Sequence, residues 1–175
     1  NGTEYDGTLR KGTVTLEDFY QAELIVLLGQ NPGTNHPRML TALEKARHQG
    51  AKIVSINPLA EAALVRFKNP QDFLHPIKGL QTLLGAGTQM AELHLPVRIN
   101  GDVALLQYVC RRLMERGAVD DDFIQSRCLG FEEFAQALQR EVPERLLEEC
   151  GLSYSEVEPL VDLLARSQRI IFCWA

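Results

Sequence analysis

The sequence lacks closely spaced cysteines. Its 175 residues include four, and no two form a CxxC pair or a cluster with histidine: Cys110, Cys128, Cys150 and Cys173. That spacing excludes a zinc ribbon or an iron–sulfur cluster held within this chain. Isolated cysteines on apolar segments are typical of small buried side chains in a reducing compartment, so we expect a cytoplasmic protein.

Long apolar runs and an excess of positive charge are missing too. No run approaches the roughly 20 residues of a membrane span, and we expect no signal peptide. The net charge of −5 and the pI of about 5.4 argue against a nucleic-acid-binding protein. The acidity is uneven, because residues 117–166 hold 12 acidic and 4 basic residues, whereas residues 1–116 hold 11 acidic and 13 basic.

Several motifs of well-known active sites do not occur either. The sequence contains no P-loop, no nucleophile elbow and no residues spaced as metal ligands. Of the GxGxxG dinucleotide fingerprint only two glycines are present, Gly29 and Gly33. We therefore identify no catalytic and no metal-binding residue in this chain.

The apolar residues that are present predict alternating strands and helices. Leu24–Leu28 and Lys52–Ile56 read as parallel strands that are buried on both faces. Between them, Pro37 begins a helix whose apolar residues recur at helical spacing up to Gly50. Strand, helix and strand within about 33 residues indicate a βαβ unit with a right-handed crossover.

The remaining segments complete the predicted fold. We expect a loop over residues 1–14, a helix over 16–22, a strand over 93–99, a helix over 103–116, short acidic helices after Gly117 and a strand over 169–172. Residues 59–92 are too long for an ordinary connection and read as a loop excursion. The sequence thus predicts an α/β fold, Rossmann-like, with three α/β/α layers, a mostly parallel sheet and a helix-rich C-terminal half. Residues 1–175 would form one domain.

Three predicted strands end in polar loops, at the edge where parallel sheets bind ligands. Residues 29–37 combine glycines with a helix N-terminus, as a phosphate cradle requires, although a tight loop shaped by Gly and Pro reads the same. Asn57 follows a strand where dinucleotide folds often hold an acid against ribose, or it forms the turn before Pro58. Asp102 either supports a helix dipole or accepts two hydrogen bonds from a guanine edge.

These loops resemble those of a known family. Residues 29–40, GQNPGTNHPRML, resemble the G-x-N-P-x-x-x-H-P loop of molybdopterin-dependent oxidoreductases of the dimethyl sulfoxide reductase superfamily, on its formate-dehydrogenase-like branch. The similarity continues in the same order through residues 50–54, 57–58, 99–106, 130–134 and 151–157. The first loop looks most like the group called predicted oxidoreductase alpha (molybdopterin) subunit.

The resemblance implies a Rossmann-like domain that holds one guanosine arm of a bis-molybdopterin guanine dinucleotide (bis-MGD). The phosphate-facing residues would be Gly29, Gln30, Asn31, Thr34, Asn35 and His36. The ribose and guanine contacts would be Asn57, Pro58, Arg98, Asn100 and Asp102. The sequence departs from many members at two places: Asn57-Pro58-Leu59 stands where they have Asp-Pro-Arg, and Asn100 stands where they have glycine.

The resemblance also implies what the whole protein would do. The chain would be a fragment of the catalytic subunit of a molybdenum or tungsten oxidoreductase, with formate as one candidate substrate, and would not be active alone. Its partners would be the remaining domains of that subunit, a small-molecule substrate and an electron-transfer partner, with any iron–sulfur cluster outside this segment. A guanine-nucleotide-binding regulatory or chaperone-like module and a nicotinamide-dependent dehydrogenase are the alternatives. The missing third glycine and the missing acid at Asn57 weigh against the dehydrogenase.

Overall fold

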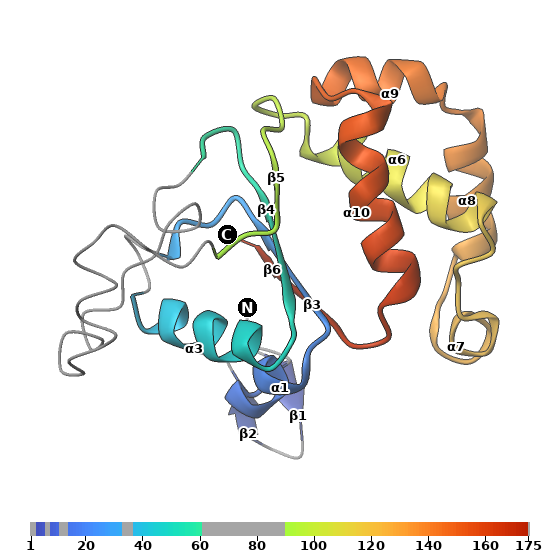
Figure 1. Ribbon diagram of the computed structural model, residues 1–175. Helices are drawn as coiled ribbons and strands as arrows, with labels where there is room; N and C mark the ends of the chain where they lie inside the picture. The colour runs from blue at the N-terminus through green and yellow to red at the C-terminus, as the bar shows by residue number, and fades with distance from the viewer. Residues whose placement is uncertain (1–2, 6–7, 11–13, 33–36, 61–89, 175) are drawn as a thin grey trace, which may run out of the picture. The chain divides into compact units, whose positions relative to one another are not determined.

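The structure, a computed structural model, describes residues 3–5, 8–10, 14–32, 37–60 and 90–174. The chain divides into two compact units (Figure 1). The first unit contains Asn1–Ile53, Glu61–Glu92 and Gln168–Ala175, and the second contains Val54–Ala60 and Leu93–Ser167. Each unit holds part of the predicted site, so each is described by itself.

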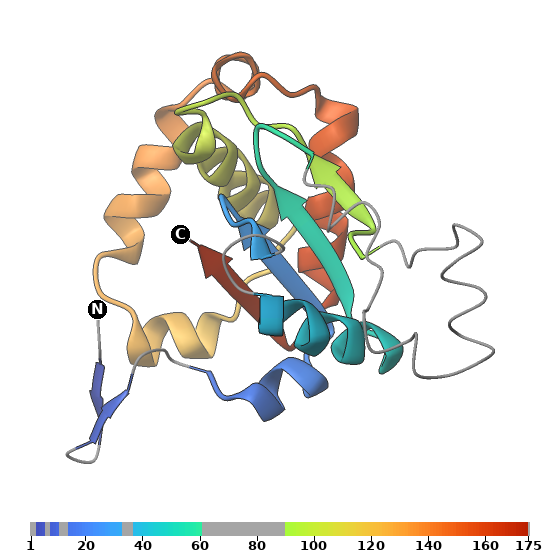
Figure 2. The same ribbon diagram turned by 90° about the vertical axis from the view of Figure 1, so that its left-hand side faces the viewer.

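Four strands form one parallel sheet in the order β5-β4-β3-β6. Their bounds are Leu24–Leu28 for β3, Lys52–Ile56 for β4, Leu93–Leu95 for β5 and Ile170–Trp174 for β6. Leu24 pairs with Ile170 and Leu28 with Trp174, so β3 and β6 run in register, and their arrows point the same way in Figure 2. The parallel sheet and its helices confirm the predicted α/β fold.

The first unit is built around the apolar residues of β3. Successive strand residues point to opposite faces, so Ile25 and Leu27 share one face. They pack in one buried cluster with Ile171 of β6 and with Leu43 of α3 (Pro37–His48). Helix α1 (Leu16–Gln21) precedes β3 and begins with a capping box between Thr15 and Asp18. The unit therefore depends mainly on apolar packing.

The second unit is helical after β5. Its helices are α6 (Asp102–Glu115), α7 (Asp121–Arg127), α8 (Phe131–Arg140), α9 (Pro143–Cys150) and α10 (Tyr154–Arg166). Helix α6 packs against α8, α9 and α10 and buries Leu105, Tyr108 and Val109 (Figure 1). This arrangement confirms the helix-rich C-terminal half.

A buried carboxylate joins α6 to α10. Glu158 accepts a hydrogen bond of 2.8 Å from Nε of Arg112 and forms a second ion pair with Arg116. Nη1 of Arg116 also contacts Asp162 at 2.5 Å. Burial, together with the nearby Glu158 charge, raises the pKa of Tyr108 to about 12. The network fixes α6, the helix that begins with Asp102.

Two segments differ from the sequence-based expectation. Residues 1–14 were expected to form a loop, yet Thr3–Tyr5 (β1) and Thr8–Arg10 (β2) pair as antiparallel strands, because Thr and Tyr favour extended backbone. The third sheet strand ends at Leu95 rather than continuing to residue 99. Pro96 has no N–H to donate, and the backbone N of Val97 turns back to the carbonyl oxygen of Leu95 at 2.9 Å.

Candidate functional site

A tight turn over residues 98–102 connects β5 to α6. The backbone N of Gly101 donates to the carbonyl oxygen of Arg98 at 2.8 Å, and the backbone N of Arg98 donates to that of Cys150 at 2.8 Å. Asn100 has a φ of 68°, in the left-handed region that glycine adopts most easily. Asparagine tolerates this region better than most residues that carry a Cβ, so Asn100 can adopt the conformation of the turn.

The predicted site omitted Gly101, which lies in this turn between Asn100 and Asp102. A Cβ atom at its position would lie 2.7 Å from Cα of Cys150 and 2.9 Å from the carbonyl oxygen of Arg98. Both neighbours are backbone atoms, so neither can rotate away. The turn thus approaches the end of α9 closely enough that only glycine fits. The glycine between Asn100 and Asp102 was the only sign of this close approach in the sequence. Its neighbour Cys150 lies far along the chain, so the contact could not be predicted.

Asp102 is the first residue of α6, one residue before the predicted start of this helix, and its side chain is half-buried. Asn57 directly follows β4, and its backbone N donates to the carbonyl oxygen of Leu95 at 3.1 Å. Within the part of the chain that the structure describes, neither side chain has a hydrogen bond or an ion pair. A carboxylate at a helix N-terminus and an amide at a strand end are therefore available to a ligand in the second unit.

Arg98 has a structural role that the sequence did not reveal. Its Nη1 donates to the carbonyl oxygen of Glu148 at 3.0 Å, in the last turn of α9. A cation is favourable there because unpaired carbonyl groups give a helix C-terminus partial negative charge. A guanidinium carries five N–H groups, so this bond leaves others for a ligand. Pro58 lies exposed after Asn57.

In the first unit, the predicted phosphate loop begins with Gly29, which has free space around it. Gly29 has a φ of +67°, and a Cβ atom built there would meet nothing within 4 Å. Nε2 of Gln30 donates to the carbonyl oxygen of Trp174 at 3.0 Å, which ties the loop to the end of β6. Its Oε1 is buried without a partner among the described residues. Asn31 is half-buried, and Thr34, Asn35 and His36 lie outside the described residues.

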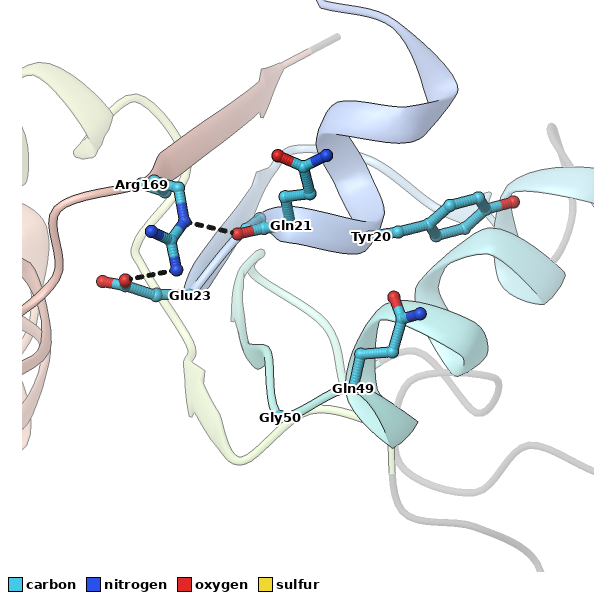
Figure 3. Close-up of a pocket in the computed structure, with 7 residues that line it drawn as sticks. Tyr20, Gln21, Glu23, Gln49, Gly50 and Arg169 are labelled. Carbon is cyan, nitrogen blue, oxygen red and sulfur yellow. Dashed lines mark hydrogen bonds and ion pairs between the residues drawn. The ribbon is translucent and has the colours of Figure 1, made fainter.

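The first unit also contains a cavity of about 320 Å³ (Figure 3). Arg169 borders it, donating from Nε to the carbonyl oxygen of Gln21 at 2.7 Å and pairing with Glu23 at 2.7 Å. Glu23 and Arg169 directly precede β3 and β6, so this cavity lies at the amino ends of those strands. Ligands of open parallel sheets bind at the carboxyl ends, and the ion pair here is better explained as a structural link.

The described residues contain no group of three or more His, Cys, Asp or Glu side chains that could hold a metal ion. Cys150 is buried and Cys110 and Cys173 are partly buried, and this burial raises the pKa of all three thiols, which lowers their reactivity. Cys128 differs from that expectation because it is exposed. Among the helices of the described ranges, none is both long and apolar enough for a transmembrane segment.

Comparison with known proteins gives relatives over nearly the whole chain. The chain is 39% identical over 174 residues to protein YdeP of Escherichia coli and 37% identical over 171 residues to an uncharacterised oxidoreductase of Mycobacterium tuberculosis, each alignment covering 94% of this chain. It is 22% identical over 159 residues to formate dehydrogenase H of Escherichia coli, covering 91% of this chain. The homologues are members of the molybdopterin-dependent oxidoreductase family, and the chain is similar to one part of them. No protein-family model matches it.

Members of this family are much longer than the chain. It spans only 22% of YdeP, 21% of the mycobacterial oxidoreductase and 19% of formate dehydrogenase H. A solved structure agrees on the fold: acetylene hydratase from Pelobacter acetylenicus superposes with a TM-score of 0.68 at 19% identity, covering 88% of this chain and 18% of that protein. The chain therefore corresponds to about one fifth of its relatives.

Proposed function

We propose that this chain is the Rossmann-like domain that holds a guanosine arm of the bis-MGD cofactor, within the catalytic subunit of a formate-dehydrogenase-like molybdenum or tungsten oxidoreductase. The observation that carries the proposal is Asp102. It is the first residue of α6, half-buried, without a partner among the described residues, and beside a turn that accepts only glycine at position 101. The similarity of 94% of the chain to a much longer relative, among homologues of the molybdopterin-dependent oxidoreductase family, supports the assignment.

The polar groups of the second unit suit a guanosine. The two oxygens of the Asp102 carboxylate can accept the neighbouring N–H groups of a guanine edge, which adenine does not present. The amide of Asn57 can donate to and accept from ribose hydroxyls. Arg98 supplies further hydrogen-bond donors. Asn100 lies in the same turn as Arg98, and Pro58 follows Asn57 at the end of β4. Each hydrogen bond to a charged group contributes about 1.5–3 kcal/mol.

The loop of the first unit suits the phosphates. Gly29 leaves the backbone open, and the loop leads into the N-terminal end of α3, where unpaired N–H groups favour anions. In this proposal Gly29, Gln30 and Asn31, followed by Thr34, Asn35 and His36, face the pyrophosphate. The bound cofactor would supply the metal that exchanges two electrons with substrate, and this chain would hold and orient the nucleotide end.

The proposal is tested by replacing Asp102 with alanine in the full-length protein. We expect the guanine nucleotide released from the purified protein to fall about tenfold, because a lost charge-assisted bond of about 1.4 kcal/mol or more changes affinity by that factor. The measurement is the molar ratio of guanine nucleotide and of molybdenum or tungsten to protein. Metal and nucleotide should decrease together.

Glu144→Ala is the matched control. Glu144 is another first-turn acid of the second unit, at the start of α9, so its removal costs the same favourable interaction with a helix dipole. If Asp102 only stabilises α6, both variants will keep their nucleotide, and the proposal fails. A protein that contains guanine nucleotide but neither molybdenum nor tungsten would instead favour the non-catalytic guanine-nucleotide-binding module.

A further inference from the structure

Helix α7 is the least supported element of the second unit. It has seven residues and no buried side chain. Asp120 caps it by accepting a hydrogen bond of 2.8 Å from the backbone N of Phe123. Isolated helices shorter than about 12–15 residues are marginal in water, because most helical stability in proteins comes from packing of an apolar face. A cap alone does not supply that stability, so α7 needs a partner surface.

The apolar side chains for such a contact are present and exposed. Phe123 of α7 is 58% exposed, Leu129 in the connection to α8 is fully exposed, and Phe134 of α8 is 45% exposed. A cavity of about 460 Å³ lies between these helices, and Ile124, Cys128 and Phe131 contribute to its lining. An apolar patch with a recess of this kind is typical of a contact with another protein surface. We call these residues the α7–α8 surface.

The charges around the α7–α8 surface are mostly negative. The acids of this region are Asp120, Asp121, Asp122, Glu132 and Glu133. Arg127 is the one basic residue between positions 119 and 134. Two copies of the chain that met through this surface would bring acid against acid, which is unfavourable. Its electrostatic complement is an apolar surface with a rim of Lys and Arg.

We propose that the α7–α8 surface packs permanently against a basic, apolar-centred surface elsewhere in the longer polypeptide that contains this chain. Relatives are about five times as long, since the chain spans 21–22% of two of them, so such a polypeptide offers the surface within one molecule. A permanent partner fits better than a transient electron-transfer protein, because α7 would lose its packing in every interval between encounters. The inference relies on the proposed function only in treating the chain as part of a larger subunit.

Cys128 provides the test, because it is exposed in this chain and lies on the α7–α8 surface. The full-length protein is treated with N-ethylmaleimide, and modification of the Cys128 peptide is followed by mass spectrometry in native buffer and in urea. We expect native modification to be at least about tenfold slower than in urea, since the thiol reacts only when the contact opens. Native modification within about threefold of the rate in urea would overturn the proposal.

Charge reversal separates this contact from other causes of protection. Asp121→Lys with Glu132→Lys reverses two charges on the α7–α8 surface, and we expect it to restore rapid modification of Cys128. Glu144→Lys with Glu148→Lys makes the same charge change at exposed positions on α9 and should leave the protection intact. Equal protection in both variants would show that the acidic rim does not select the partner, and would contradict the proposal.

Carbodiimide cross-linking of the unaltered protein decides the matter even if the charge-reversed protein does not fold. Cross-links from the acids of the α7–α8 surface to lysines outside residues 1–175 of the same polypeptide support the proposal. Mixing isotopically light and heavy protein identifies cross-links between copies. Cross-links between copies or to a separate protein overturn the proposal. The absence of cross-links to the same polypeptide outside residues 1–175 also overturns it. Guanine nucleotide is measured on the same samples. Protection without bound nucleotide would refute the cofactor proposal alone, and bound nucleotide without protection would refute this one alone.

Discussion

The two loops proposed to hold the cofactor use glycine for opposite reasons. Gly29, in the first unit, needs its positive φ of +67° and has open space where a Cβ would lie. Gly101, in the second unit, has an ordinary φ of −91°, but a Cβ there would overlap the backbone of α9. The first glycine is required by conformation, and the second by packing.

Different hydrogen bonds hold the two loops in place. A hydrogen bond from Nε2 of Gln30 to the carbonyl oxygen of Trp174 ties the start of the first loop to β6. Backbone hydrogen bonds from Arg98 and Gly101 hold the second turn, and Nη1 of Arg98 adds a bond to the end of α9. We infer that the turn before Asp102 is preformed, as recognition of one base requires.

The largest effect should come from Gly101→Ala. The added Cβ would lie 2.7 Å from Cα of Cys150, so backbone must move, and we expect the free energy of unfolding to fall by about 2–3 kcal/mol. Urea unfolding followed by far-ultraviolet circular dichroism measures the change. Hydrogen exchange should accelerate in the peptides of α6 and α9 before those of β3 and β6.

Gly117→Ala is the control for this variant, because Gly117 has a φ of +64° but nothing within 4 Å of a built Cβ. Alanine at position 117 must adopt left-handed backbone but overlaps no neighbouring atom, so this variant should lower the free energy of unfolding by only about 1 kcal/mol. Equal losses for the two variants would show that the close approach to α9 does not determine the identity of residue 101.

A smaller effect is expected for Gly29→Ala. Left-handed backbone costs an alanine about 1 kcal/mol, and no neighbour adds to it, so the free energy of unfolding should fall by about that amount in the same urea experiment. Gly29→Asn should lose less, since asparagine tolerates this conformation. If alanine and asparagine destabilise the chain equally, backbone conformation is not the reason for glycine at this position.

The sequence could predict what local patterns determine. The apolar runs gave the bounds of β3 and β4 as observed, and Pro37 gave the start of α3. It could not predict contacts between distant segments. The overlap of residue 101 with α9 and the bond from Arg98 to Glu148 both depend on how α9 returns to the turn, and no local spacing encodes that return.

The smallest stability effect, and the most specific test of the contrast, is expected for Asn100→Gly. Asn100 has a φ of 68°, so glycine relieves strain in the fold while adding freedom to the unfolded chain, and the two nearly cancel. We expect the free energy of unfolding to change by less than about 0.5 kcal/mol, whereas Asn100→Ala should lose about 1 kcal/mol. Guanine nucleotide content of the full-length variants then distinguishes two roles for this residue. Unchanged content in Asn100→Gly means that position 100 serves the conformation of the turn, and decreased content at unchanged stability means that its amide contacts the nucleotide.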